Sequence, residues 1–172
     1  MVKEKTFENY PAGIVFTSNL VSLSIYLIGA FLIYKTGIIW LLAVYLALIG
    51  IMELRLIRWH CTDCYYYGKT CAFGKGKLSG MLFKKGDSSK FCKMKITWKD
   101  IVPDFAISLV PAVIGIILVI RDFDWILLSL VLVLFVLTFM GNSFIRSQLA
   151  CKHCKQRELG CPAQKLFEKR GK

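Results

Sequence analysis

The chain has 172 residues, of which 56% are hydrophobic, and its 23 Lys and Arg residues against 11 Asp and Glu residues give a formal net charge of +12. Soluble domains contain about 45–50% apolar residues and disordered chains contain fewer. The composition therefore excludes a disordered chain, and the length allows one domain. The hydrophobic residues also lie in long runs, which is typical of a membrane protein.

Four hydrophobic runs are long enough, or nearly long enough, to cross a bilayer. They are residues 14–34, 38–52, 105–120 and 125–145. A bilayer core needs about 20 apolar residues. The second and third runs reach this length with their apolar flanks, if Arg55 extends its charged end to the head groups and Asp104 lies at the interface. None shows the polar stripe of a helix in a soluble bundle, so we predict an all-α integral membrane protein with four transmembrane helices.

Short connections pair these helices into hairpins. Residues 35–37 join the first two runs and residues 121–124 join the last two. Links this short require antiparallel neighbours, so both termini and the middle segment lie on the same side of the membrane. The predicted parts are a first hairpin at residues 1–57, a Cys-rich segment at 58–100, a second hairpin at 101–145 and a Cys-rich tail at 146–172.

Basic residues predict the orientation. All of the 23 Lys and Arg residues except Lys35 and Arg121 lie in the termini, the middle segment or the helix ends next to them. Cytoplasmic loops carry such an excess of Lys and Arg. We therefore expect a multi-pass protein of the plasma membrane with both termini and both Cys-rich segments in the cytoplasm. Attraction to anionic lipid head groups is expected on the same side.

The cysteines reveal an internal duplication. The first motif, Cys61-x2-Cys64-x6-Cys71, recurs as the second motif, Cys151-x2-Cys154-x6-Cys161, with an offset of 90 residues. Each motif follows a predicted hairpin, and both hairpins have the same topology. We therefore predict a tandem, parallel repeat whose axis runs along the membrane normal.

Metal ligation is the chemistry that best fits these cysteines. The cytoplasm is reducing, so structural disulfides are disfavoured there, and seven is an odd number. Two thiolates of a C-x2-C turn can converge on one ion, and neighbouring Lys and Arg favour the thiolate form. Short polar segments cannot build a core of their own and need additional stabilisation. Structural zinc contributes about 10–16 kcal/mol of folding free energy. The predicted ligands are Cys61, Cys64, Cys71, Cys92, Cys151, Cys154 and Cys161.

Two arrangements of these ligands stay open. In one, each motif holds its own metal, with three sulfurs converging within each motif, Cys92 completing the first site, and His153, another group or solvent completing the second. In the other, the two C-x2-C pairs share one four-cysteine site that joins the hairpins. Soft thiolate sets select zinc or iron–sulfur clusters, and the sequence does not decide between them. Glycines 68, 74, 76 and 80 are interpreted as turns around the metal.

Three functions are compatible with this reading. The first is an iron–sulfur electron relay between a cytosolic donor and a membrane carrier. The second is a zinc-stapled scaffold or docking protein without catalysis, and the third is a membrane thiol oxidoreductase. Whether the chain is an enzyme stays open, because no catalytic set stands out. Expected partners are the bilayer and a cytosolic redox or docking protein, whereas the lack of a recognisable nucleic-acid-binding motif argues against nucleic acid.

Overall fold

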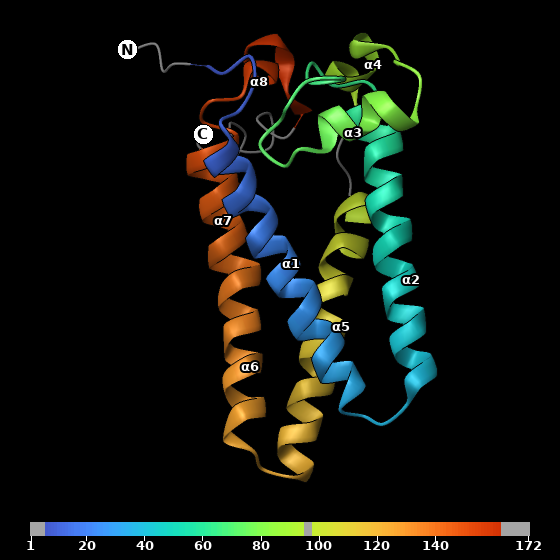
Figure 1. Cartoon of the computed structure of the whole chain (residues 1–172), viewed down its shortest axis with the longest axis vertical. Helices are drawn as coiled ribbons and strands as arrows, with labels where there is room; N and C mark the ends of the chain where they lie inside the picture. The colour runs from blue at the N-terminus through green and yellow to red at the C-terminus, as the bar shows by residue number, and fades with distance from the viewer. Residues whose placement is uncertain (1–5, 95–97, 163–172) are drawn as a thin grey trace. The chain divides into compact units, whose positions relative to one another are not determined.

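The computed structural model describes residues 6–94 and 98–162, with side chains of 98–101 excepted (Figure 1). The described residues form an all-helical chain, and their β-structure is limited to one isolated bridge between Phe7 and Cys154. Four helices are long and apolar enough to cross a membrane, which confirms the predicted number of spans. These candidate spans are Ala12–Tyr34, Ile39–Cys61, Val102–Arg121 and Trp125–Ala150.

The chain divides into two compact units. The four-helix unit comprises Asn19–Glu53 and Lys99–Phe144. The cysteine-rich unit comprises Met1–Ser18, Leu54–Trp98 and Ile145–Lys172. All seven cysteines belong to the cysteine-rich unit.

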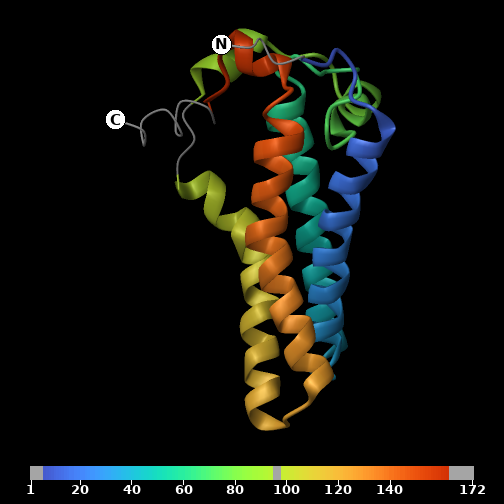
Figure 2. The ribbon, with the colours of Figure 1, turned by 90° about the vertical axis from the view of Figure 1, so that its left-hand side faces the viewer.

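The long helices follow the hydrophobic runs closely. They are α1 (Ala12–Tyr34), α2 (Ile39–Leu56), α5 (Trp98–Arg121) and α6 (Trp125–Val136). Within the four-helix unit they lie side by side, and short turns join α1 to α2 and α5 to α6 (Figures 1 and 2). Asp124 begins α6, because its carboxylate accepts a hydrogen bond from the Ile126 N–H at 2.8 Å and so caps an otherwise unpaired donor.

Wider π-helical turns extend two of the spans. α2 continues as η1 (Ile57–Cys61), and α6 continues through η2 (Leu137–Gly141), α7 (Asn142–Phe144) and η3 (Ile145–Ala150). Three short helices complete the described chain: α3 (Lys75–Leu82), α4 (Ser88–Lys93) and α8 (Lys155–Gly160). π-Helical turns inside α-helices are rare and frequently occur at functional sites.

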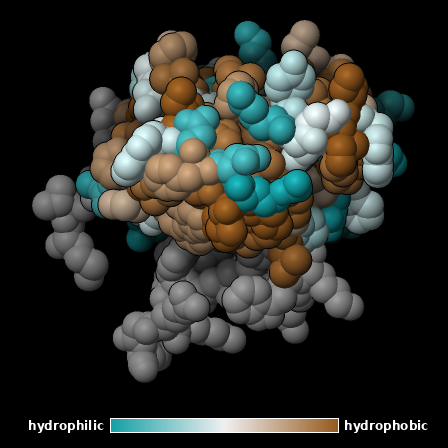
Figure 3. Space-filling view, turned by 90° about the horizontal axis from the view of Figure 1, so that it is seen from below, coloured by the Kyte–Doolittle hydropathy of each residue, from teal (hydrophilic) through white to brown (hydrophobic). Residues whose placement is uncertain are grey.

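The core of the four-helix unit is thin, as expected for helices that face lipid. Its buried residues are Ile25, Leu32, Ala112, Leu127, Val131 and Leu134. Large apolar side chains point outward instead, including Ile39 at 74% and Ile120 at 78% exposure. In water such a surface would promote aggregation, whereas in a bilayer it contacts acyl chains. The face seen from below carries hydrophilic residues mixed with hydrophobic ones (Figure 3).

Polar contacts inside the four-helix unit satisfy specific backbone and carboxylate groups. Pro111 in α5 has no N–H to donate to the carbonyl of Ile107, and the Tyr45 hydroxyl donates to that carbonyl at 3.0 Å. Tyr26 donates to the Glu53 carboxylate at 2.6 Å. Glu53 thus lies within the candidate span Ile39–Cys61, although the uncharged part of this hydrophobic run ends at Met52. An ionisable group inside a span is expensive unless it is paired, and Tyr26 supplies the partner.

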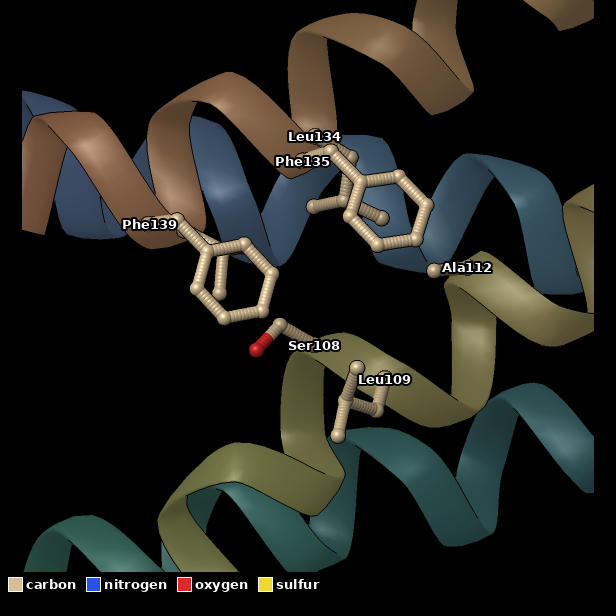
Figure 4. A pocket seen from close by; sticks show the side chains of 7 residues that line it. Ser108, Leu109, Ala112, Leu134, Phe135 and Phe139 are labelled. Carbon is tan, nitrogen blue, oxygen red and sulfur yellow. The ribbon is translucent and has the colours of Figure 1, made fainter.

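A shallow apolar pocket lies between α5 and the continuous α6–η2 segment. The rings of Phe135 and Phe139 project toward α5, which contributes Ser108 and Ala112 (Figure 4). The Ser108 hydroxyl donates to the Phe105 carbonyl at 3.2 Å. Both Ser108 and Ala112 are buried, as expected for small residues at a close helix contact. The pocket therefore offers packing and little polar chemistry.

Candidate functional site

Each cysteine motif begins where a candidate span ends. The last residue of η1 is Cys61, and Cys151 directly follows η3. η1 starts at Ile57 and η3 starts at Ile145, and both isoleucines are buried. A π-helical turn with a buried isoleucine at its first position thus precedes both motifs.

One equivalent backbone hydrogen bond follows the second cysteine of both motifs. The Cys64 carbonyl accepts a hydrogen bond from the Tyr67 N–H at 3.0 Å, and the Cys154 carbonyl accepts one from the Arg157 N–H at 3.1 Å. Tyr67 and Arg157 are 90 residues apart, which is the offset of the motifs. The likeness is limited to this bond, because the chain continues as a turn after Cys64 and as helix α8 (Lys155–Gly160) after Cys154.

Backbone N–H groups also point at three of the sulfurs. The Gly76 N–H donates to Cys71 Sγ at 3.3 Å. Backbone hydrogen bonds from Tyr66 to Cys64 and from Gln156 to Cys154 lower the pKa of each thiol against the larger opposing effect of burial. Such donors stabilise a thiolate more than a neutral thiol, so they suit sulfurs that act as metal ligands.

Burial of the thiols and charge repulsion between thiolates oppose deprotonation. Burial, with smaller contributions from Cys71 and Cys161, raises the pKa of Cys64 to about 11. Burial likewise raises the pKa of Cys154 to about 12, with Cys64 and Cys151 adding to the shift. Although Cys151 is exposed, partial desolvation by the surrounding chain raises the pKa of its thiol, and Cys161 adds to the shift. Thiols of both motifs thus affect one another's pKa, and Cys64, Cys71 and Cys154 share one neighbourhood through their common packing.

Aromatic side chains pack around this neighbourhood. Cys64, Cys71 and Cys154 pack against a buried cluster that contains Tyr10 and Tyr66. The Tyr66 hydroxyl donates to the Phe7 carbonyl at 2.6 Å and accepts from the Lys155 N–H at 3.0 Å. Tyr10 donates to the Ala150 carbonyl. The N-terminal segment and both motifs are thereby joined in one core.

An ionic cluster on the surface joins the same three segments. The Glu8 carboxylate pairs with Lys69 in the first motif at 3.0 Å and with Lys155 in the second. The Tyr65 hydroxyl donates to Glu8 at 2.6 Å, and the Lys69 ammonium lies 4.3 Å from the centre of the Tyr65 ring. Exposed ion pairs contribute little stability individually, so this cluster orients the segments more than it stabilises them.

Gln156 is the buried polar side chain that connects the two motifs, with 2% of its surface exposed. Its Oε1 accepts from the Tyr65 N–H at 2.7 Å, and its Nε2 lies 3.7 Å from Cys92 Sγ as a donor. Cys92 in turn donates from its sulfur to the Leu159 carbonyl at 3.3 Å. Helix α4, which carries Cys92, is thus attached to helix α8.

Glycines bring helix α3 against the first motif. A Cβ on Gly76 would lie 2.2 Å from the Tyr66 carbonyl oxygen, and one on Gly80 would lie 2.9 Å from the Gly68 Cα. Gly68 and Gly74 have positive φ, which fits the predicted turns. Gly76 and Gly80 instead lie within α3, so the turn interpretation was wrong for them. Their role is close approach of two backbones.

The three sulfurs that were expected to converge within each motif do not do so here. No disulfide joins any of the seven cysteines, all of which lie among the described residues. Among the described residues, no three His, Cys, Asp or Glu side chains are close enough to hold a metal ion. His153, predicted as a supplementary ligand, packs its ring 5.0 Å from the ring of Phe7. The zinc and iron–sulfur hypotheses therefore stay predictions.

Comparison with known protein families, curated proteins and solved structures gives no match to the chain. The function is therefore inferred from the residues of the cysteine-rich unit.

Proposed function

We propose that the chain is a multi-pass membrane protein that binds a soft metal through its cysteine-rich unit and serves as an iron–sulfur electron relay at the membrane. One observation carries the proposal: Cys64 and Cys71 of the first motif and Cys154 of the second pack against the same buried cluster, although the motifs are 90 residues apart in sequence. A relay would accept electrons from a cytosolic donor and pass them to a carrier in the membrane.

A bound metal cation would offset the charge repulsion between thiolates in the cysteine-rich unit. Buried thiols that repel one another resist deprotonation, and a metal supplies the positive charge that makes thiolates stable. The N–H donors at Cys64, Cys71 and Cys154 already favour that charge state. Hydrogen bonds to sulfur and burial also set the reduction potential of an iron–sulfur cluster. Burial and N–H donors of this kind would therefore tune the potential of a bound cluster.

The tandem repeat and the orientation belong to the same proposal. The paired π-helical turns and the equivalent hydrogen bonds at Cys64 and Cys154 support a duplicated unit. The positions of Lys and Arg favour a cytoplasmic location for both motifs and both termini. In a reducing cytoplasm the thiols would stay available to the metal.

A basic surface next to the first motif fits an anionic partner. Six lysines lie within or between α3 and α4, where Asp87 is the single acidic residue. These lysines are Lys75, Lys77, Lys84, Lys85, Lys90 and Lys93. Positive charge of this density attracts anionic lipid head groups and steers an acidic protein toward the surface. We propose an acidic cytosolic redox protein as the electron donor.

Anaerobic purification of the full chain in detergent tests the proposal. Iron and acid-labile sulfide in the protein, with a visible absorption that dithionite bleaches, are the expected result. Zinc in a colourless protein would replace the relay with a zinc-stapled docking protein. A chain without metal whose cysteines cycle between thiol and disulfide would support the thiol oxidoreductase instead.

A further inference from the structure

We propose that helix α3 is an interfacial helix, which lays its outer face into the anionic surface of the bilayer beside the first motif. This outer face consists of Leu78, Met81 and Leu82. The inference goes beyond the proposed function, and it holds whether or not the cysteines bind a metal. It assigns a docking surface and its occupant, the lipid leaflet.

The inner face of α3 consists of small residues. Gly76 and Ser79 are buried, and a Cβ on Gly80 would lie 2.9 Å from the Gly68 Cα. Glycine lets two backbones approach closely, so the protein itself covers this face of α3. A helix on the surface of a soluble protein instead turns its large apolar side chains toward the core.

The outer face of α3 carries the large apolar side chains. Leu78, Met81 and Leu82 follow the spacing i, i+3 and i+4, which places them on one side of a helix. At roughly 100° per residue this side lies opposite the buried Gly76 and Ser79. All three apolar side chains are exposed, and Met81 is 77% exposed. A contiguous apolar stripe of this kind marks a contact with a membrane or a protein.

Hydrogen bonds hold α3 at the end of the candidate span Ile39–Cys61. The Ser79 hydroxyl donates to the Cys61 carbonyl at 3.5 Å. Shortly after the helix, the Gly86 N–H donates to the Thr62 carbonyl at 3.1 Å. α3 also packs directly against η1 (Figures 1 and 2). The helix therefore lies at the level where the span ends.

Trp59 supports an interfacial position for this part of the chain. It lies in η1, two residues before Cys61, and its side chain is 65% exposed. Tryptophan is enriched where the polar head groups meet the acyl chains. The apolar stripe of a helix fixed at this depth meets lipid, whereas a cytosolic protein would have to displace head groups to reach it.

Positive charge around the stripe selects anionic lipid. Lys77 lies within α3, Lys84 and Lys85 follow shortly after it, and all three are exposed. Residues 75–86 contain no acidic side chain. A helix with aliphatic residues on one face and lysines beside them lies in the plane of the interface, where lysine stems cover apolar surface and the ammonium groups reach the phosphates. The exposed lysines of α4 are left for the acidic donor of the proposed function.

Site-specific photocrosslinking of the full chain in lipid nanodiscs tests the assignment. The test variant is Met81→benzoylphenylalanine. The matched control is Glu158→benzoylphenylalanine, at an exposed acidic residue of α8, where anionic lipid is disfavoured. In nanodiscs of phosphatidylcholine and phosphatidylserine in equal parts, mass spectrometry should detect a phospholipid adduct at position 81 and little or none at position 158.

A second variant separates the charge from the apolar contact. With the lysines unchanged, the adduct at position 81 should be weaker in phosphatidylcholine alone than in the mixed nanodiscs. Lys77→Gln/Lys84→Gln/Lys85→Gln should remove this difference between the two lipid compositions, because the phosphatidylserine head group would lose its attraction to the helix.

The outcomes decide between lipid and other occupants of the stripe. Absence of a phospholipid adduct at position 81, or equal adducts at positions 81 and 158, would overturn the inference. A crosslinked protein in place of lipid at position 81 in native membranes would also overturn it and identify a protein-docking face. If the Met81 variant loses its helical circular dichroism, Leu82→benzoylphenylalanine decides. Metal analysis of the same samples tests the proposed function separately, so the failure of one is distinguishable from the failure of the other.

Discussion

The side-chain oxygen of Gln156 accepts a hydrogen bond from the backbone N–H of Tyr65 at 2.7 Å. Gln156 lies two residues after Cys154, and Tyr65 lies directly after Cys64. This bond therefore fixes the second cysteine of one motif relative to its counterpart in the other. It is the shortest polar link between the two C-x2-C turns among the hydrogen bonds described above.

Replacing Gln156 by Met should loosen the site while preserving side-chain volume. The Tyr65 N–H would lose its acceptor, which costs about 1–3 kcal/mol when the group is buried. Loss of an outer contact of a metal ligand typically lowers metal affinity about 10- to 100-fold. Competition with a chelator measures this change. Gln148→Met, at an exposed position in η3, is the matched control and should leave affinity unchanged.

A second prediction concerns the proline in α5. Tyr45→Phe should destabilise the four-helix unit by about 1–3 kcal/mol, because the Ile107 carbonyl would lose its donor. Pro111→Ala supplies a backbone N–H to that same carbonyl and should reduce the penalty of Tyr45→Phe. A double-mutant cycle of thermal unfolding in detergent measures the coupling. Additive effects of the two changes would show that Tyr45 does not replace the missing backbone bond.

Two glycines in helices make a third, paired prediction. Gly76→Ala should disrupt the first motif, since the new Cβ would lie 2.2 Å from Tyr66 O and 2.6 Å from Lys69 O. Gly50→Ala in α2 is its control, because no atom lies within 4 Å of that Cβ, and it should be neutral or stabilise the helix by about 0.5–1 kcal/mol. Thermal unfolding and metal content distinguish the two. Equal tolerance of both changes would contradict the close contact of α3 with the motif.

The predicted orientation can be checked through an exposed thiol. Cys151 is exposed, so in the metal-free protein a membrane-impermeant maleimide should modify it only after the cells are opened. A variant that retains Cys151 as its sole cysteine isolates this signal. Modification in intact cells would place the motif outside and make disulfides favourable there.

Hydropathy predicted the four spans because each one depends on local composition alone. The cysteine spacing likewise marked both motifs. Contacts between distant positions carry no comparable local signal: Tyr45 meets Ile107, and Gln156 meets Tyr65. Gln156 in particular lies in a charged stretch that reads as a solvated surface, yet it is buried. The partner of Cys92 was missed for the same reason.

The π-helical turns also could not be predicted from the sequence. Their residues continue the hydrophobic runs, and a change from α to π hydrogen bonding alters neither composition nor apolar periodicity enough to be recognised. The matching positions of Ile57 and Ile145 were the available clue. Only the backbone shows that both precede a cysteine motif as the first residue of such a turn.

Metal content of a chain with one disabled motif tests the proposed metal binding most directly. In the double variant Cys64→Ser/Cys71→Ser the second motif keeps all three of its cysteines. Metal binding through the cysteine motifs predicts that this variant, purified anaerobically beside the unchanged chain, contains less tightly bound metal than the unchanged chain. Equal metal content in the variant and the unchanged chain, or no metal in either, would contradict the account.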